Sequence, residues 1–156
     1  MPIHLSQEAA LSAALKARED LVRAARSVPE SHWSWRPGGV AHHALRILAH
    51  CAATNTFLAT VIGEQPLPYR TQDEEDAAVE SCVTLDMAEA FLNRSVTAVC
   101  DAIAQVSEAR LKQQITMPWG ERMPVAISLL SPSQHMRYHE GQLNYLQMLL
   151  GDDEYH

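Results

Sequence analysis

Three histidines are the residues of this chain whose types and spacing could do chemistry. His135 and His139 are four residues apart, so on a helix both imidazoles leave the same face, one turn from each other. His50 lies in an earlier apolar stretch, and a facing helix could bring it to the same point. Three imidazoles around a divalent ion leave coordination positions open, as in catalytic rather than structural zinc sites. The three histidines therefore predict a metal site that can admit a further ligand.

Four more residues are predicted to lie near this site. Gln142 shares the helical face of the histidine pair, where it could orient a ligand imidazole or hold a water. His43 is two turns before His50, roughly 10 Å away by helix rise, and could stand at the mouth of the pocket. Arg46, one turn from His50, could line the rim of the pocket or anchor an anionic substrate. Thr54 is a neutral pocket candidate on the same face.

Each of these features also has an interpretation without a metal. Two core histidines could be bonded to each other or to the backbone, and this spacing often arises by chance. The residues between the pair lack the glutamate of the HExxH zinc-protease motif. No acidic residue is expected on the histidine faces, so a metal would have to do the activation. The other histidines are predicted to be surface or terminal residues without a role: His4, His32, His42 and His156.

Four long helices are predicted to position these side chains, at about 6–28, 40–62, 84–106 and 131–150. The first and third carry apolar residues at helical spacing. Serine and threonine side chains can cap helix N-termini, and a glycine often follows a helix end. The expected N-caps are Ser6, Thr84 and Ser131, with Pro132 and Gln134 in the first turn of the last helix, and the expected end markers are Gly63 and Gly151.

The connecting segments complete a single domain over residues 1–156. Residues 64–81 are predicted to form a loop whose acidic run, 73–76, is a solvated surface segment. Trp33 and Trp35 are predicted to pack on the end of the core. A short hairpin is expected where Ile115–Met117 and Arg122–Val125 flank Trp119-Gly120-Glu121, with Pro118 and Pro124 restricting it to edges and a helical turn after it. The predicted fold is an all-α four-helix bundle with a long crossover between the second and third helices and this hairpin before the last.

Composition excludes several classes of protein. The net charge is −7 and no Lys/Arg cluster occurs, so no nucleic-acid partner is expected. Residues 40–62 have the length of a membrane span, but the histidines, Asn55 and Arg46 within them favour a buried helix. The N-terminus lacks the features of a signal peptide. Cys51, Cys82 and Cys100 show no CxxC spacing, which predicts free thiols and a cytoplasmic protein.

The near absence of charge on two helices predicts a homodimer. Arg46 is the only charged residue in 40–63, and Arg137 and Glu140 are the only ones in 132–150. One bundle core covers an apolar stripe and not a helix that is apolar all round. Some surface of the second or last helix is therefore expected to be covered by a second subunit or by the hairpin.

Two stretches of the chain resemble a known family. ALRILAHCAATNTFL and HMRYHEGQLNYLQMLLG look like the corresponding helices of the DinB/YfiT-like superfamily of bacterial four-helix bundles, and the upstream WSWRPGG resembles its Trp-x-x-Pro loop. The similarity extends over about residues 6–151. The resemblance implies that the metal ligands are His50, His135 and His139, followed by the signature Gly141-Gln142.

The resemblance implies either an enzyme or a binding protein. Members of the superfamily include transferases and isomerases that use low-molecular-weight thiols such as bacillithiol, mycothiol or glutathione, so a metal-activated thiol would attack an electrophile, or the site would hydrolyse its substrate. Zinc or nickel, and also iron or manganese, are compatible with imidazole ligands. The alternative is a non-catalytic metal-binding or stress-response protein. Glu140 departs from the basic residue expected beside the second histidine, which leaves the small-molecule substrate open.

Overall fold

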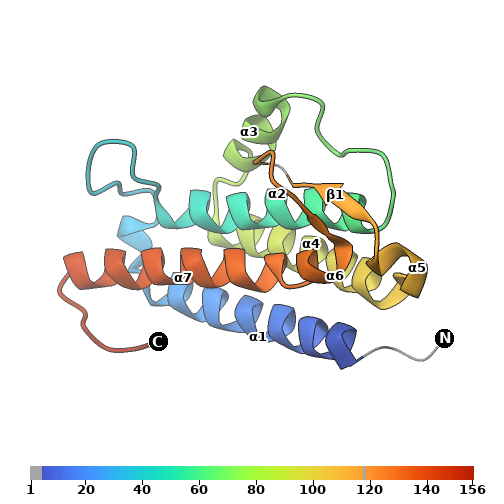
Figure 1. Cartoon of the computed structure of the whole chain (residues 1–156). Helices are drawn as coiled ribbons and strands as arrows, with labels where there is room; N and C mark the ends of the chain where they lie inside the picture. The colour runs from blue at the N-terminus through green and yellow to red at the C-terminus, as the bar shows by residue number, and fades with distance from the viewer. Residues whose placement is uncertain (1–4, 118) are drawn as a thin grey trace.

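A computed structural model of the protein describes residues 5–117 and 119–156, and four long helices pack there as a bundle (Figure 1). The long helices are α1 Leu5–Ser27, α2 Ala44–Ile62, α4 Leu85–Gln105 and α7 Ser131–Leu149. The shorter elements are a 3-10 turn at Glu30–His32, α3 Gln72–Glu80, α5 Glu108–Leu111, α6 Val125–Ser128, and strands β1 Gln114–Thr116 and β2 Arg122–Pro124. The predicted all-α bundle with a hairpin before the last helix is confirmed.

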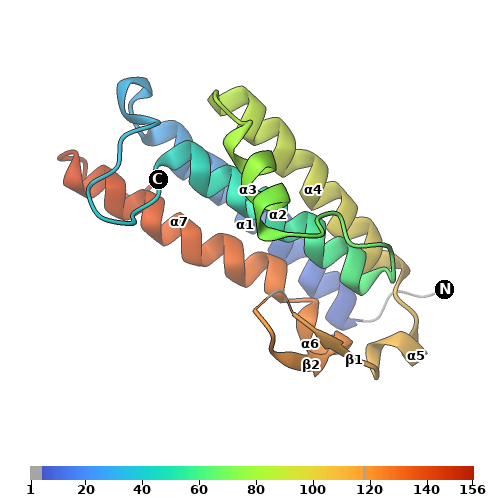
Figure 2. The same cartoon turned by 90° about the horizontal axis from the view of Figure 1, so that it is seen from above.

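The bundle consists of two tightly packed helix pairs. The most extensive contacts join α2 to α4 and α1 to α7, and α2 also packs against α7. Figure 2 shows α3 beside α2, with α5, α6 and the hairpin gathered at the end of the bundle nearest the start of α1. The two strands pair antiparallel, with Ile115 opposite Met123. This arrangement brings the two histidine-bearing helices, α2 and α7, against each other.

The predicted helix caps are partly correct. Thr84 caps α4 as expected, because its hydroxyl accepts a hydrogen bond from the backbone N–H of Met87. Ser6 lies inside α1, and the residues before Leu5 are outside the described range, so the prediction of Ser6 as N-cap is wrong. Ser131 is already helical, because the turn of α6 runs directly into α7 and leaves no separate start to cap. Pro132 lies in the first turn of α7, as predicted.

The second helix starts later than predicted. Residues 40–43 are not helical, since the preceding loop turns at Gly38 and Gly39, both of which have positive φ. His43 is the N-cap of α2, and its Nδ1 accepts a hydrogen bond from the backbone N–H of Arg46. The loop tryptophans pack against the core as predicted, and Trp33 donates its ring N–H to a backbone carbonyl.

The predicted loop at 64–81 contains a helix. Thr71 caps α3 through its hydroxyl, and Glu74 reaches back to the backbone N–H of Arg70, so the helix start is locked from both sides. Acidic residues in the first turn also suit the positive end of the helix dipole. Asp73 and Glu74 are exposed, as a solvated segment requires, whereas Glu75 and the residue after it are only half-exposed because they face α2.

A buried carboxylate joins α1 to α7. Asp20 is almost completely buried, and its oxygens accept from Lys16 Nζ at 2.7 Å, Arg23 Nη2 at 2.6 Å and Arg137 Nη1 at 2.7 Å. Burial opposes ionisation, but these hydrogen bonds outweigh it and lower the pKa of Asp20 to about 2. Arg137 also donates to Glu140 at 2.9 Å. The network accounts for two of the few charged residues on α7.

The apolar side chains of α2 are mostly buried by other helices of the same chain. By length and composition this helix could cross a membrane, but 67% of it is buried by α4, α7 and α3, as in a core helix. Cys51 is buried on it, and Cys82 and Cys100 lie elsewhere, all three as free thiols. Burial raises the pKa of each thiol, so none is poised to react as a thiolate.

Candidate metal centre

Three histidines converge between α2 and α7. His50 comes from α2, and His135 and His139 come from successive turns of α7. One ring nitrogen of each lies within 4.8 Å of one nitrogen of each of the others. The Nε2 atoms of His135 and His139 are 3.2 Å apart, and the His50 ring centroid is 5.1 and 5.0 Å from theirs. The structure thus brings together the three residues that the sequence singles out; the metal they would hold stays a prediction.

These imidazoles are uncharged at neutral pH. Burial is the main cause, and it lowers the pKa of His50 to about 4 and that of His135 to about 3. The pKa of His139 is lowered by burial as well. The neighbouring imidazoles add to the effect for the first two, because one protonated ring repels the next. Each ring therefore keeps a nitrogen lone pair free to bind a metal.

Gln142 determines which nitrogen of His139 carries that lone pair. Its Oε1 lies 2.7 Å from Nδ1 of His139 and can only accept a hydrogen bond, so the proton is on Nδ1. Nε2, which faces His135, then carries the lone pair that could bind a metal. Nδ1 of His135 is buried and has no hydrogen-bond partner in residues 5–117 and 119–156. Gln142 thus occupies the orienting position expected of it from the sequence.

The donor set fits a divalent ion of borderline character. Three neutral nitrogen donors suit zinc, nickel or ferrous iron better than the oxygen-preferring calcium or magnesium. The side chain of His50 is 35% exposed, so one of the three rings is in contact with solvent. The three histidines alone would leave positions for an outside ligand.

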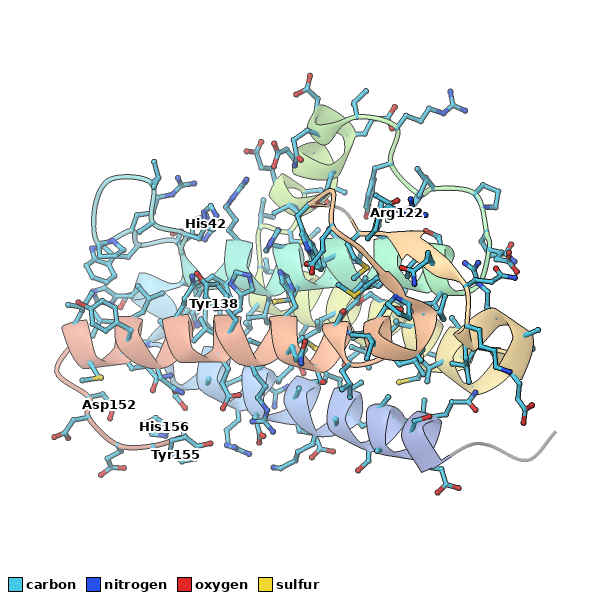
Figure 3. All side chains as sticks on the ribbon, in the orientation of Figure 1. His42, Arg122, Tyr138, Asp152, Tyr155 and His156 are labelled. Carbon is cyan, nitrogen blue, oxygen red and sulfur yellow. The ribbon has the colours of Figure 1, made fainter. Side chains whose placement is uncertain are left out.

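His42 and Tyr138 flank the three histidines, and neither was expected there. The ring of His42 is 6.4 Å from that of His50, and Tyr138 meets the edge of the His139 ring at 5.1 Å. Figure 3 shows both on the same side of α7. His42 is half-buried and its Nδ1 is a buried atom without a hydrogen-bond partner in the described residues, so the prediction that it is a surface residue is wrong.

The three predicted pocket residues, His43, Arg46 and Thr54, are not part of the group of converging ligand atoms. The ring of His43 caps α2, and beside it Arg46 turns toward α3, where it pairs with Asp76 at 2.9 Å and Glu80 at 3.3 Å. These pairs leave the guanidinium little freedom to anchor a substrate, although both side chains line a shallow pocket next to α3. Thr54 is buried one turn after the α2 histidine.

An acidic residue that the sequence analysis did not place near the histidines lies beside the site. Glu75 of α3 places Oε1 4.0 Å from Nδ1 of His50, and its side chain is only 21% exposed. Burial, followed by the nearby Asp76, raises the pKa of Glu75. The expectation of no acidic residue concerned the faces of the two histidine-bearing helices, and this carboxylate comes instead from a third helix that was predicted from the sequence as a loop. The capping pattern of Thr71 and Glu74 could have predicted the start of the helix that carries Glu75.

Two residues next to the signature glutamine do not line the site. Glu140 is buried against Arg137 on the side of α7 that faces α1, so its departure from the basic residue expected of the family leaves the donor set intact. A Cβ built at Gly141 would meet nothing within 4 Å in the described part of the chain, so no other backbone approaches this glycine closely within the subunit.

His32 and His156 lie away from the three histidines. His32 contacts Ser31 and the edge of Trp35. His156 pairs with Asp152 at 2.8 Å on the C-terminal tail, which Figure 3 shows on the opposite side of α7 from His42 and Tyr138. His4 falls outside the described residues.

Comparison with known proteins supports the same fold. The sequence profile of the DinB superfamily matches residues 13–143. A conserved protein from Enterococcus faecalis superposes with a TM-score of 0.76 at 16% identity, covering 97% of this chain and 100% of that one. A DinB-like protein from Bacillus subtilis superposes with a TM-score of 0.67 at 18% identity, with 94% of each chain covered.

One further structural relative has a named activity. A mycothiol-dependent maleylpyruvate isomerase superposes with a TM-score of 0.73 at 17% identity. The match covers 92% of this chain but only 61% of the isomerase, so this chain spans about three fifths of that protein. A search of curated sequences gave no significant match.

Proposed function

Because the chain belongs to the DinB superfamily, we propose that it is a divalent-metal-dependent enzyme that uses a low-molecular-weight thiol in a transfer or isomerisation reaction. His50, His135 and His139 would hold the ion. The observation that carries the proposal is the convergence of three uncharged imidazoles from two helices, with the side chain of His50 35% exposed. Two core histidines that merely bond to each other would not require the third from α2.

The residues of the chain define what the site would do. A divalent ion held there would act as a Lewis acid and lower the pKa of a water or thiol that binds it. The three neutral rings do not offset the charge of the ion, so the site would attract an anion such as a thiolate. Gln142 keeps the ring proton of His139 on Nδ1 and so leaves Nε2 unprotonated, as a metal ligand must be. Zinc and nickel are the first candidates, and iron and manganese are compatible.

The thiol part of the proposal rests on a structural relative. The mycothiol-dependent isomerase shares the fold of this chain at 17% identity, and two fifths of its length have no counterpart here. Whatever that remaining length contributes to the isomerase is not carried over to this protein. The proposal therefore names the class of thiol and leaves the electrophile open.

We expect the cobalt-substituted protein to bind one biological thiol through sulfur. The measurement is a titration with mycothiol, bacillithiol and glutathione, watched in the near ultraviolet for a sulfur-to-cobalt charge-transfer band. The S-methylated form of each thiol is the control, because it cannot offer a thiolate. A band with the free thiol alone supports transfer chemistry and identifies the thiol.

Other outcomes would overturn the thiol part of the proposal. No band with any thiol, together with rapid exchange of water at cobalt, would favour a hydrolase. No band and no exchangeable position would leave a metal-binding protein without catalysis.

We also propose a homodimer in which α7 contributes the contact. The burial of α2 removes that helix from the argument, but α7 exposes Tyr138, Tyr145 and Leu149, which are seven and four residues apart and share one face. Gly141 on that face has open space above it. A second copy of the chain would cover this apolar surface.

We propose that the protein is cytoplasmic because its cysteines are free.

The dimer can be tested by light scattering coupled to gel filtration. The parent should elute with twice the mass of the 17.3 kDa chain at micromolar concentration, and Tyr145→Lys should give the monomer mass because it places a charge in the contact. Tyr155→Lys, on the exposed C-terminal tail, should remain dimeric. A monomeric parent would contradict the proposal.

A further inference from the structure

The acidic face of α3 is tied to the metal centre through two contacts. Glu75 lies 4.0 Å from Nδ1 of His50, and Arg46, one turn before His50, pairs with Asp76 and Glu80 of the same short helix. The side chains of Arg46 and Asp76 are 20% and 39% exposed, so this pair is partly shielded from solvent, whereas Glu80 is 71% exposed. A helix of nine residues with one buried side chain, Val79, has little core packing of its own. Arg46 therefore contributes much of what holds α3, and Glu75 with it, against α2.

Glu75 stands behind His50 rather than among the donors. Its oxygens are not part of the set of mutually close ligand atoms, which contains the three histidines. His139 already has such a partner, since Gln142 accepts its Nδ1 proton. A carboxylate on the outer nitrogen of a ligand imidazole fixes the tautomer and ring orientation and raises the basicity of the ligand.

We infer that Glu75 is a positioning residue of the metal centre: its carboxylate accepts the Nδ1 proton of His50 and directs Nε2 toward the ion, and Arg46 holds it there by clamping α3. The inference rests on the metal site proposed above and deepens it. The two atoms are 4.0 Å apart, so the hydrogen bond requires the side chains to approach by about 1 Å. The site would then have an outer partner on two of its three ligands, an amide for His139 and a carboxylate for His50.

The first test is the zinc affinity of Glu75→Ala, measured by competition with a chromophoric chelator. We expect binding about 10- to 100-fold weaker than in the parent, as for other outer partners of ligand histidines. Asp73→Asn is the matched control, because it removes the same charge from an exposed position of the same helix, and it should bind zinc like the parent. In the zinc-loaded parent the Nδ1 proton of His50 should give a nuclear magnetic resonance signal protected from exchange with water, and Glu75→Ala should lose that protection.

Replacing Arg46 tests whether it acts through its charge or by holding Glu75 in place, because the two roles predict opposite changes in zinc affinity. Electrostatics alone predicts that removing a cation near the ion tightens zinc binding. If Arg46 acts by holding Glu75 in place, Arg46→Met should weaken it instead. The double variant with Glu75→Ala should then be no weaker than Glu75→Ala alone, because both changes remove the same interaction.

The outcomes distinguish this inference from the metal site itself. Circular dichroism and thermal unfolding in the presence of chelator show that each variant folds. A parent that binds zinc, with Glu75→Ala equal to it or Arg46→Met tighter than it, would overturn the role of Glu75 and leave the three-histidine site standing. A folded parent that does not bind zinc would overturn both.

Discussion

Replacing His135 with alanine is expected to abolish stoichiometric metal binding. The parent should retain about one divalent ion per chain, whereas the variant would offer two nitrogens in place of three. Loss of an outer partner of a ligand costs about 10- to 100-fold in affinity, so loss of a ligand should cost at least about 100-fold. Elemental analysis of both purified proteins, followed by zinc titration, measures the effect.

The control for this experiment is His42→Ala. It removes an imidazole from the same neighbourhood, 6.4 Å from the His50 ring, that is not among the converging donors. This variant should keep the metal content of the parent. With chelator present, circular dichroism should show that His135→Ala is folded, with a Tm lowered only by the loss of the ring and of its 3.2 Å contact with His139. Equal metal content in His135→Ala and the parent would refute the ligand assignment.

Local patterns in the sequence predict the main helices well. The apolar spacing of α1 and α4 places their buried faces, and Thr84 marks the start of α4 through a cap that needs only adjacent residues. Apolar spacing does not predict α3, because this helix buries little besides Val79 and so has no apolar stripe. Its stability comes from a cap at Thr71 and from the pairs with Arg46, a residue about thirty positions earlier in the chain.

The candidate site was predictable only where its residues share an element. His135, His139 and Gln142 lie on one helix, so their spacing alone predicts that they meet. His50 could be added because α2 and α7 were expected to face each other. Glu75 and His42 could not, since their positions depend on how a short helix and a loop return to α2, and no periodicity encodes that path.

The second large effect expected is a loss of stability in Asp20→Asn. The asparagine would keep the shape of the side chain but lose the charge that three cations bind, and Arg137 would be left with Glu140 alone. Hydrogen bonds to a charged group contribute about 1.5–3 kcal/mol, and the cations are partly exposed, so we expect the free energy of unfolding to fall by about 2 kcal/mol. In a chain of this length that corresponds to a decrease of roughly 5 °C in Tm. Circular dichroism near neutral pH, with chelator added, measures it without a contribution from metal.

The pH dependence of this difference identifies its cause. The pKa of Asp20 is about 2 in the folded protein and 3.8 as the ordinary value, so the unfolded chain binds the proton first as the pH falls. The stability that the parent has over Asp20→Asn should therefore be complete above about pH 4 and be lost progressively toward pH 2. The three histidines titrate in both proteins and cancel in the comparison. Glu19→Gln, which removes an exposed carboxylate from the neighbouring position of α1, should unfold like the parent. An Asp20→Asn variant as stable as the parent near neutral pH, or a difference that persists unchanged at pH values near 2, would show that the charge of Asp20 does not join the two helices.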